Sequence, residues 1–232
     1  MKKVLLFALC LILMLGCVGC GADTPEWLLT KQTMVENGNT TVATYTYDGE
    51  GTLLSYEIRV NDVLNTQNEV EYDENGYKSY EKATLASGLV VEMFFTNDTR
   101  GRVTEQRTVS NYVGSISESV SRFEYTDTYG SYVQTVVSGP GKGSTVTVTK
   151  DEKGNELTHA ESTGLFIRYE NTYDGDVLTE RTGVYTRLGG SSTVRTVYEY
   201  DEHGNNVCTT SYDADGKVTL AQTYEYSSAD GE

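Results

Sequence analysis

The sequence predicts an all-β protein, an antiparallel meander of tandem β-hairpins that forms a curled sheet, an open barrel or a two-layer sandwich. Three observations support this fold class. A D-x-x-G motif, shortened in one copy, recurs at a nearly even spacing except for a half-length last step, with its acids at Asp48, Asp73, Asp98, Asp127, Asp151, Asp174, Asp201 and Asp213. The segments between the motifs alternate apolar and polar residues. The chain also has 18 tyrosines, 23 glycines and only two prolines, a composition that favours strands over helices.

The D-x-x-G motif has a mechanical meaning in a hairpin. The aspartate accepts hydrogen bonds from backbone amides further along the turn, and the glycine adopts the left-handed conformation that other residues resist. The clearest copies are Tyr45–Gly51, Tyr72–Gly76 and Tyr198–Gly204. The distance from one copy to the next accommodates two strands and two turns, so each unit is expected to be one hairpin with a half-connection.

The strands expected between these turns have one apolar and one polar face. Leu54, Tyr56, Ile58 and Val60 occupy alternate positions, and the residues between them are Ser, Glu and Arg. Because successive side chains of a strand point to opposite faces, this spacing predicts a half-buried strand. We expect the tyrosines to form the core of the sheet through cross-strand pairs.

The second connection of each unit is irregular in sequence. In a continuous meander the D-x-x-G turns fall along one edge of the sheet and the irregular segments along the other. The irregular edge is therefore the expected binding surface. The expected irregular segments are 61–67, 86–89, 110–117, 138–144, 162–165 and 186–192, and the candidate binding residues in or beside them are Tyr112, Pro140, Lys142, Tyr185 and Arg187.

The two ends of the repeat region fit the same scheme. Residues 27–35, the turn at Asn37-Gly38 and residues 40–47 predict an opening hairpin, although Thr24-Pro25 could instead begin a short helix that runs through Met34. Asp213–Gly216 predicts a closing hairpin. The total is roughly 14 to 17 strands, more than a flat sheet usually carries without curling or splitting.

The N-terminal segment has the features of an export signal. Lys2 and Lys3 precede an uncharged apolar run, Val4–Gly16, which is too short to span a bilayer. Cys17 follows this run in a context similar to the lipobox of bacterial lipoproteins, and Cys20 is a second candidate for the lipidated residue. The alternatives are an ordinary secretory signal and a single anchoring helix. We expect an extracytoplasmic protein that is lipid-anchored to the bacterial cell membrane.

The chain then divides into four parts. We expect a signal and lipobox region over residues 1–20, a short tether over 21–26, a single β-repeat domain over 27–226 and a disordered acidic tail over 227–232. Without Lys2 and Lys3 the chain has 16 basic and 34 acidic residues. This acidity disfavours nucleic-acid binding, which depends on Lys and Arg that neutralise phosphates.

Residues with catalytic chemistry are scarce after the signal region. The β-repeat domain contains two histidines, His159 and His203, and one cysteine, Cys208. We expect His203 to be solvated within its turn and Cys208 to be a buried strand residue. Acid pairs suited to a glycosidase are Glu69 with Glu71 and Glu170 with Asp174 and Asp176, but 34 acids produce such pairs by chance.

The turns at Asp73–Gly76 and Asp213–Gly216 offer clustered oxygens, as calcium loops do. Neither continues into the spaced ligands of an EF-hand. We therefore expect no metal, no cofactor and no enzymatic activity.

The recurring Tyr-Asp-x-x-Gly between Thr- and Tyr-rich strands resembles the YD repeats of Rhs-type proteins. The resemblance covers most of residues 27–226 but depends on four or five residues per unit, and the tyrosine is missing before Asp127 and Asp151. It implies a long, curled antiparallel sheet. The expected function is a non-catalytic, envelope-anchored binding or scaffold module for a protein partner. A glycan-binding module for wall or host polysaccharide is the alternative, and a glycoside or ester hydrolase is a weaker one.

Overall fold

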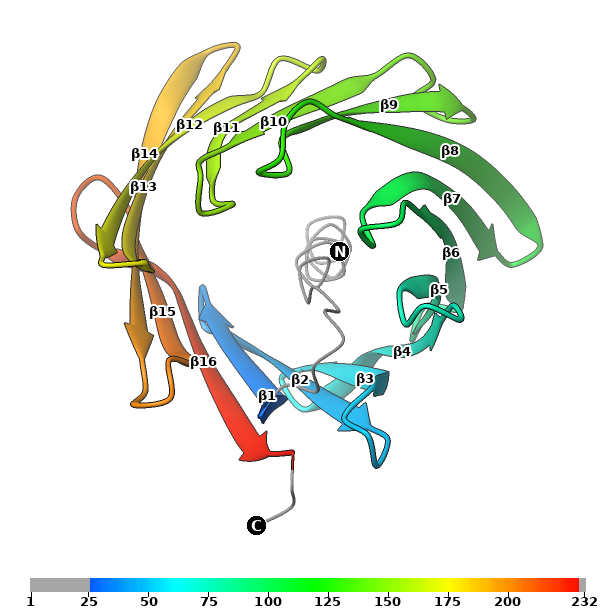
Figure 1. Ribbon diagram of the computed structural model, residues 1–232, viewed down its shortest axis with the longest axis horizontal. Coiled ribbons are helices and arrows are strands. Elements are labelled where there is room, and N and C mark those ends of the chain that lie inside the picture. The colour runs from blue at the N-terminus through cyan, green and yellow to red at the C-terminus, as the bar shows by residue number, and fades with distance from the viewer. Residues whose placement is uncertain (1–25, 230–232) are drawn as a thin grey trace.

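The computed structural model describes residues 26–229, and these form a closed β-barrel of sixteen antiparallel strands (Figure 1). Cys17, Cys20, the signal region and the tether up to residue 25 lie outside the described residues, as do the last three residues. The strands are β1 (Trp27–Glu36), β2 (Asn39–Tyr47), β3 (Leu53–Val60), β4 (Val63–Tyr72), β5 (Lys78–Leu85), β6 (Leu89–Asn97), β7 (Val103–Tyr112), β8 (Ser115–Tyr125), β9 (Tyr132–Ser138), β10 (Thr145–Lys150), β11 (Glu156–Glu161), β12 (Phe166–Asp174), β13 (Val177–Arg187), β14 (Gly190–Tyr200), β15 (Asn206–Tyr212) and β16 (Val218–Ser228).

The all-β meander predicted from the sequence is confirmed. Each strand pairs with its neighbours in the chain, and the first and last strands pair with each other. The β1–β16 register runs from Trp27 opposite Ser228 to Val35 opposite Ala221. Closure removes the exposed sheet edges that a long open meander would leave for uncontrolled pairing.

The opening hairpin forms as a strand pair and not as a helix. Asn37 and Gly38 join β1 to β2 with φ angles of 49° and 79°, the left-handed conformation of a tight hairpin turn. At the other end, β16 continues to Ser228, slightly beyond the boundary expected from the sequence.

The turns lie along two rims. The repeat rim comprises the turns at residues 48–52, 73–77, 98–102, 126–131, 151–155, 175–176 and 201–205, together with the start of β1 and the end of β16. The variable rim comprises the turns at residues 37–38, 61–62, 86–88, 113–114, 139–144, 162–165, 188–189 and 213–217. The expectation that every D-x-x-G turn shares one edge is wrong for Asp213–Gly216. It follows Asp201 after only half of the usual spacing, so one strand, β15, separates it from the preceding turn.

Much of the variable edge expected as irregular loop is regular strand. β7 continues to Tyr112 and β8 begins at Ser115, so Val113 and Gly114 alone form the connection. The Thr-, Ser- and Tyr-rich segments have high strand propensity, and two-residue turns suffice to join them. The connection at residues 139–144, which contains Pro140, is a longer loop.

The two faces of the barrel wall differ in burial. The buried strand residues, such as Tyr56, Ile58 and Ile167, all occupy the same face when followed from strand to strand through the pairing register. The inner surface of a closed barrel crowds its side chains, whereas the outer surface spreads them apart. This buried face is therefore the inner wall, and most of the tyrosines lie on it.

Candidate functional site

The aspartate of each full-length D-x-x-G turn is used by the turn itself. Oδ1 of Asp48 accepts hydrogen bonds from the amides of Glu50 and Thr52 at 2.9 and 2.8 Å, and these bonds lower the pKa of the carboxyl group. The turn glycine Gly51 has a φ of 81°. The same two amide bonds form at Asp73, Asp98, Asp127, Asp151, Asp201 and Asp213. The motif therefore stabilises turns, and within residues 26–229 no cluster of His, Cys, Asp and Glu suits a metal ion.

The tyrosine of the motif fastens neighbouring strands together. The hydroxyl of Tyr47 donates to the carbonyl of Leu29 at 2.8 Å, and that of Tyr200 donates to the carbonyl of Leu178 at 2.8 Å. Tyr125 and Tyr226 repeat this arrangement at 3.2 and 3.1 Å. Burial raises the pKa of Tyr47 to about 12. These hydroxyls serve the structure of the barrel.

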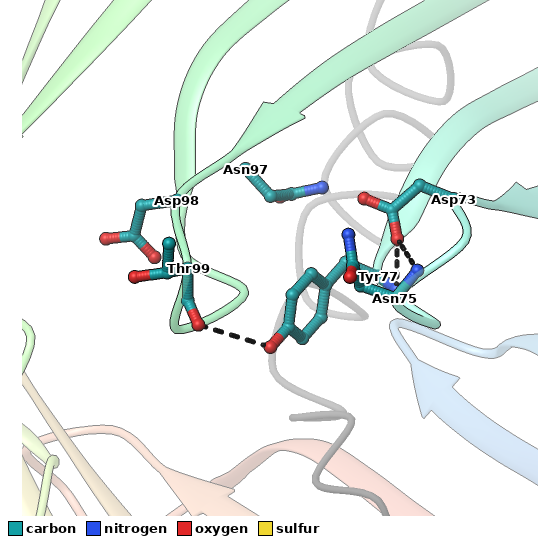
Figure 2. Close-up of a pocket in the computed structure, with 6 residues that line it drawn as sticks. All are labelled: Asp73, Asn75, Tyr77, Asn97, Asp98 and Thr99. Carbon is teal, nitrogen blue, oxygen red and sulfur yellow. Dashed lines mark hydrogen bonds between the residues drawn. The ribbon is translucent and has the colours of Figure 1, made fainter.

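A small hollow lies between two adjacent repeat-rim turns (Figure 2). Asp73 and Asp98 line it, but their carboxylates are bonded into their own turns, and Asp98 also pairs with Arg102 at 2.7 Å. Tyr77 crosses the hollow and its hydroxyl donates to the carbonyl of Thr99 at 3.4 Å. The hollow follows from the stacking of turns, and its polar groups have structural partners.

The histidines and the cysteine lie on separate elements. His203, in the β14–β15 turn, is not simply solvated as expected, because its ring stacks on Trp27 with centroids 4.4 Å apart. His159 lies on the inner wall, with Nε2 3.5 Å from the carboxylate of Glu161. Cys208 is half-buried on the outer wall of β15 and is not the buried core residue expected from the sequence.

The acids considered as catalytic pairs have other surroundings. Glu69 pairs with Lys82 at 3.3 Å and Asp176 pairs with Lys153 at 2.9 Å. Glu170 is exposed on β12. These contacts hold the carboxylates on the surface of the barrel.

The outer wall carries charged side chains on several pairs of neighbouring strands. Cross-strand ion pairs join β1 to β16, β4 to β5, β7 to β8 and β13 to β14. They are Lys31–Glu225 at 2.7 Å, Lys82–Glu69 at 3.3 Å, Arg107–Glu118 and Arg122–Glu105 at 3.0 Å, and Arg195–Glu180 at 2.7 Å. Such exposed pairs contribute little to stability, but they make these parts of the outer wall polar.

The five binding candidates lie at or near the variable rim. Tyr112 ends β7 and is 52% exposed. Pro140 and Lys142 belong to the 139–144 loop, and Arg187 ends β13. Tyr185 differs from the others, because it packs edge-on against Tyr169 on the inner wall with centroids 6.5 Å apart.

Sequence reasoning missed a group of apolar residues at the same rim. Val63, Val113, Ile116 and Leu188 are 70%, 85%, 69% and 98% exposed, and among the described large hydrophobic residues these four are the most exposed. Val113 also has a φ of 50°, an uncommon conformation for a β-branched residue. For Val113 and Leu188 the sequence does contain a signal, because each aliphatic residue directly precedes a glycine in a tight turn, where Asn or Asp is usual.

The rims also differ in charge. The seven repeat-rim turns contain eleven acidic and three basic residues, whereas the eight variable-rim turns contain three acidic and two basic residues. The variable rim is therefore the less charged and more apolar end of the barrel.

Comparisons with known proteins identify a similar fold but do not assign the chain to a family. No known protein family and no curated protein matches the sequence. The barrel is similar to a porin-like protein from Bacteroides uniformis ATCC 8492, with 15% identity and a TM-score of 0.53 over 88% of this chain and 99% of that chain. A porin-like protein from Bacteroides vulgatus ATCC 8482 has 10% identity and a TM-score of 0.48 over the same shares.

A complex named TcdB2-TccC3-Cdc42 aligns with 81% of this chain and 13% of its own, at 13% identity and a TM-score of 0.24. The first of these likenesses establishes the class of fold, a porin-like closed β-barrel. The part of the chain that the structure describes contains no helix long and apolar enough to cross a membrane.

Proposed function

We propose that this protein is a non-catalytic envelope lipoprotein whose barrel stands in water and binds a protein partner through its variable rim. The observation that carries the proposal is that the four most exposed aliphatic side chains, Val63, Val113, Ile116 and Leu188, all lie at that rim, at the β3–β4, β7–β8 and β13–β14 connections. Exposed apolar side chains on several connections of one rim offer contacts to a partner that covers the whole rim.

The outer wall supports a barrel that faces water. Arg107, Arg122 and Arg195 lie on the outer wall, and an arginine on the lipid-facing side of a barrel costs about 2–4 kcal/mol at the middle of a bilayer. A membrane-spanning barrel has an apolar outer band, whereas the outer wall of this barrel carries arginine–glutamate ion pairs.

The position of the chain ends supports the choice of rim. Trp27 and Ser228 both lie at the repeat rim. A lipid on Cys17 or Cys20 would be only a short segment of chain before Glu26, a tether of roughly 20–30 Å when extended. Such a tether would keep the repeat rim near the membrane and leave the variable rim facing away from it.

The tyrosines of the inner wall are poorly suited to bind a polysaccharide. The hydroxyls of Tyr47, Tyr125, Tyr200 and Tyr226 are bonded to main-chain carbonyls of the barrel. A sugar would have to displace these bonds or do without them.

Photo-crosslinking in cells tests the proposal. A photoreactive amino acid placed at Leu188 or at Val113 of the full-length chain should capture the same protein, identified by mass spectrometry. Val177, a 42% exposed apolar residue beside a repeat-rim turn, is the matched control and should capture none. Capture of the same protein from Val177, or of no protein from either variable-rim position, would contradict the proposal.

A further inference from the structure

One stretch of the barrel wall departs from the regular ladder. β11 and β12 pair at only three positions, where Thr158–Ala160 face Phe166–Arg168, whereas the other neighbouring strands pair at four to nine positions. Nearer the repeat rim, side chains replace the backbone bonds. Nδ2 of Asn171 donates to the carbonyl of Glu156 at 3.1 Å and to Oδ2 of Asp151 at 3.1 Å.

This interruption brings an arginine into a fixed position on the inner wall. Arg181 lies opposite Asn171 in the β12–β13 register. Its Nε donates to Oδ1 of Asn171 at 3.0 Å, and one terminal nitrogen donates to Oδ1 of Asn155 at 3.4 Å. The guanidinium lies over the ring of Tyr169, 5.0 Å from its centroid. Two amide oxygens and an aromatic face therefore orient the guanidinium plane.

A glycine makes room for this packing. Gly183 is buried on the inner wall of β13, and a Cβ atom there would come within 3.1 Å of Cε1 of Tyr169 and 3.0 Å of Cε2 of Tyr185. Glycine in the interior of a strand weakens it and often marks a close approach. Near Arg181 the barrel wall therefore has fewer backbone hydrogen bonds between β11 and β12, and it has a glycine in place of a residue with a side chain.

Among the described residues Arg181 makes no direct ion pair, and the nearest carboxylate in its hydrogen-bond network, that of Asp151, reaches it only through Asn171. Within residues 26–229 no carboxylate lies within 4.0 Å of its guanidinium, whereas Arg107, Arg122 and Arg195 on the outer wall each pair with a glutamate. The chain as a whole has a formal charge of −16, so acids are abundant. An arginine that is held by neutral oxygens retains free N–H donors for an anion.

Tyrosines surround the same position. Burial raises the pKa of Tyr198 and of Tyr200, and the positive charge of Arg181 opposes this rise in both. In the β13–β14 register Arg181 lies opposite Thr196, and Tyr198 is the next residue of β14 on the same face. Aromatic rings beside a planar cation fit an anionic ligand that carries an apolar ring.

We propose that Arg181, oriented by Asn155 and Asn171 over Tyr169, binds the carboxylate of a small aromatic acid inside the barrel. The guanidinium fork donates to both carboxylate oxygens, and the neighbouring tyrosines contact the ring. This site is on the inner wall, separate from the variable rim, and it does not depend on the proposed function.

Calorimetric titration of the purified full-length protein in detergent tests this site. Benzoate is the probe, benzamide is its neutral isostere and inorganic phosphate is a second anion. The variants are Arg181→Gln, Arg181→Lys and the control Arg195→Gln on the outer wall. We expect benzoate to bind with millimolar affinity, at least tenfold more weakly in Arg181→Gln, and with unchanged affinity in Arg195→Gln. Benzamide should not bind detectably.

Arg181→Lys keeps the charge and removes the fork, so it should give an intermediate affinity and serves if Arg181→Gln fails to fold. Equal benzoate affinity in the wild type and both Arg181 variants, or tighter binding of phosphate than of benzoate, would overturn the proposal. The absence of benzoate binding to the wild type at concentrations up to roughly 20 mM, about twentyfold above a Kd of about 1 mM, would also overturn the proposal.

Discussion

The hydroxyl of Tyr56 on β3 donates a hydrogen bond of 2.5 Å to Oε1 of Glu81 on β5, across the intervening strand β4. Tyr56 and Glu81 are 2% and 1% exposed, respectively. Lys78 completes the group with an ion pair of 2.9 Å to Oε2 of Glu81. Side chains two strands apart meet only where a sheet curves toward them, so this contact also identifies the inner wall.

Removal of the Tyr56 hydroxyl should destabilise the barrel. Tyr56→Phe leaves the buried carboxylate of Glu81 with one partner fewer, which typically costs about 1–3 kcal/mol. Urea unfolding should show this loss, whereas Tyr112→Phe at the exposed end of β7 should leave the midpoint unchanged. A double-mutant cycle with Glu81→Gln isolates the pair, and a coupling energy of zero would show that the two side chains do not interact.

The turn aspartates should make stability depend on acid. The amides of Thr52 and Glu50 lower the pKa of Asp48 in the folded protein. The stabilisation from this carboxylate is therefore present above the ordinary pKa of about 3.9 and is lost as the pH falls through the lower, folded value. Asp48→Asn keeps an acceptor oxygen that does not titrate, so its unfolding midpoint should fall less steeply between pH 4 and pH 2. Asp48→Ala should lower the midpoint at pH 7 as well, and equal midpoints for Ala and wild type would be inconsistent with the turn geometry.

Gly101 should tolerate substitution less well than Gly76. Both have left-handed φ angles, of 75° and 78°, but a Cβ at Gly101 would lie 2.5 Å from the ring of Tyr77, whereas Gly76 has open space. Gly76→Ala should cost about 1–2 kcal/mol for the conformation alone, and Gly101→Ala more. Thermal or urea unfolding measures both. Truncation of the ring with Tyr77→Ala should reduce the additional cost, and an unchanged difference would exclude the contact as its cause.

The stacking of Trp27 on His203 should report closure of the barrel. The chain has one tryptophan, and it lies on the strand that pairs with β16. His203→Ala should expose the indole and shift its fluorescence emission to longer wavelength. Glu50→Ala, a change at an exposed residue of another repeat-rim turn, should not. Identical emission from His203→Ala and the wild type would show that the two rings are not in contact.

The repeat architecture was accessible from the sequence because each motif acts locally. Asp48, Gly51 and Tyr47 stabilise their own hairpin, so the hairpins and the polar and apolar faces follow from the residue pattern. The closure of β1 onto β16 depends on residues from opposite ends of the chain, and local turns do not specify it. The curl of sixteen paired strands decides between a barrel and a sandwich.

The candidate surfaces were only partly accessible from the sequence. Tyr112 and Arg187 were assigned to the correct rim because the alternation of turns determines which end of a strand each residue occupies. Val113 and Leu188 were missed because an aliphatic residue is ordinarily assigned to a core, and only the two-residue turns reveal their exposure. The surroundings of Arg181 arise from an interrupted ladder that no local motif marks.

Sedimentation of residues 22–232 in buffer without detergent tests the central claim, that the charged face is the outer wall of a barrel in water. We predict a single monodisperse species with a β-sheet circular dichroism spectrum and buried Trp27 fluorescence. A protein that aggregates without detergent, and becomes monodisperse and folded only in micelles, would show that an apolar face points outward and would contradict the account.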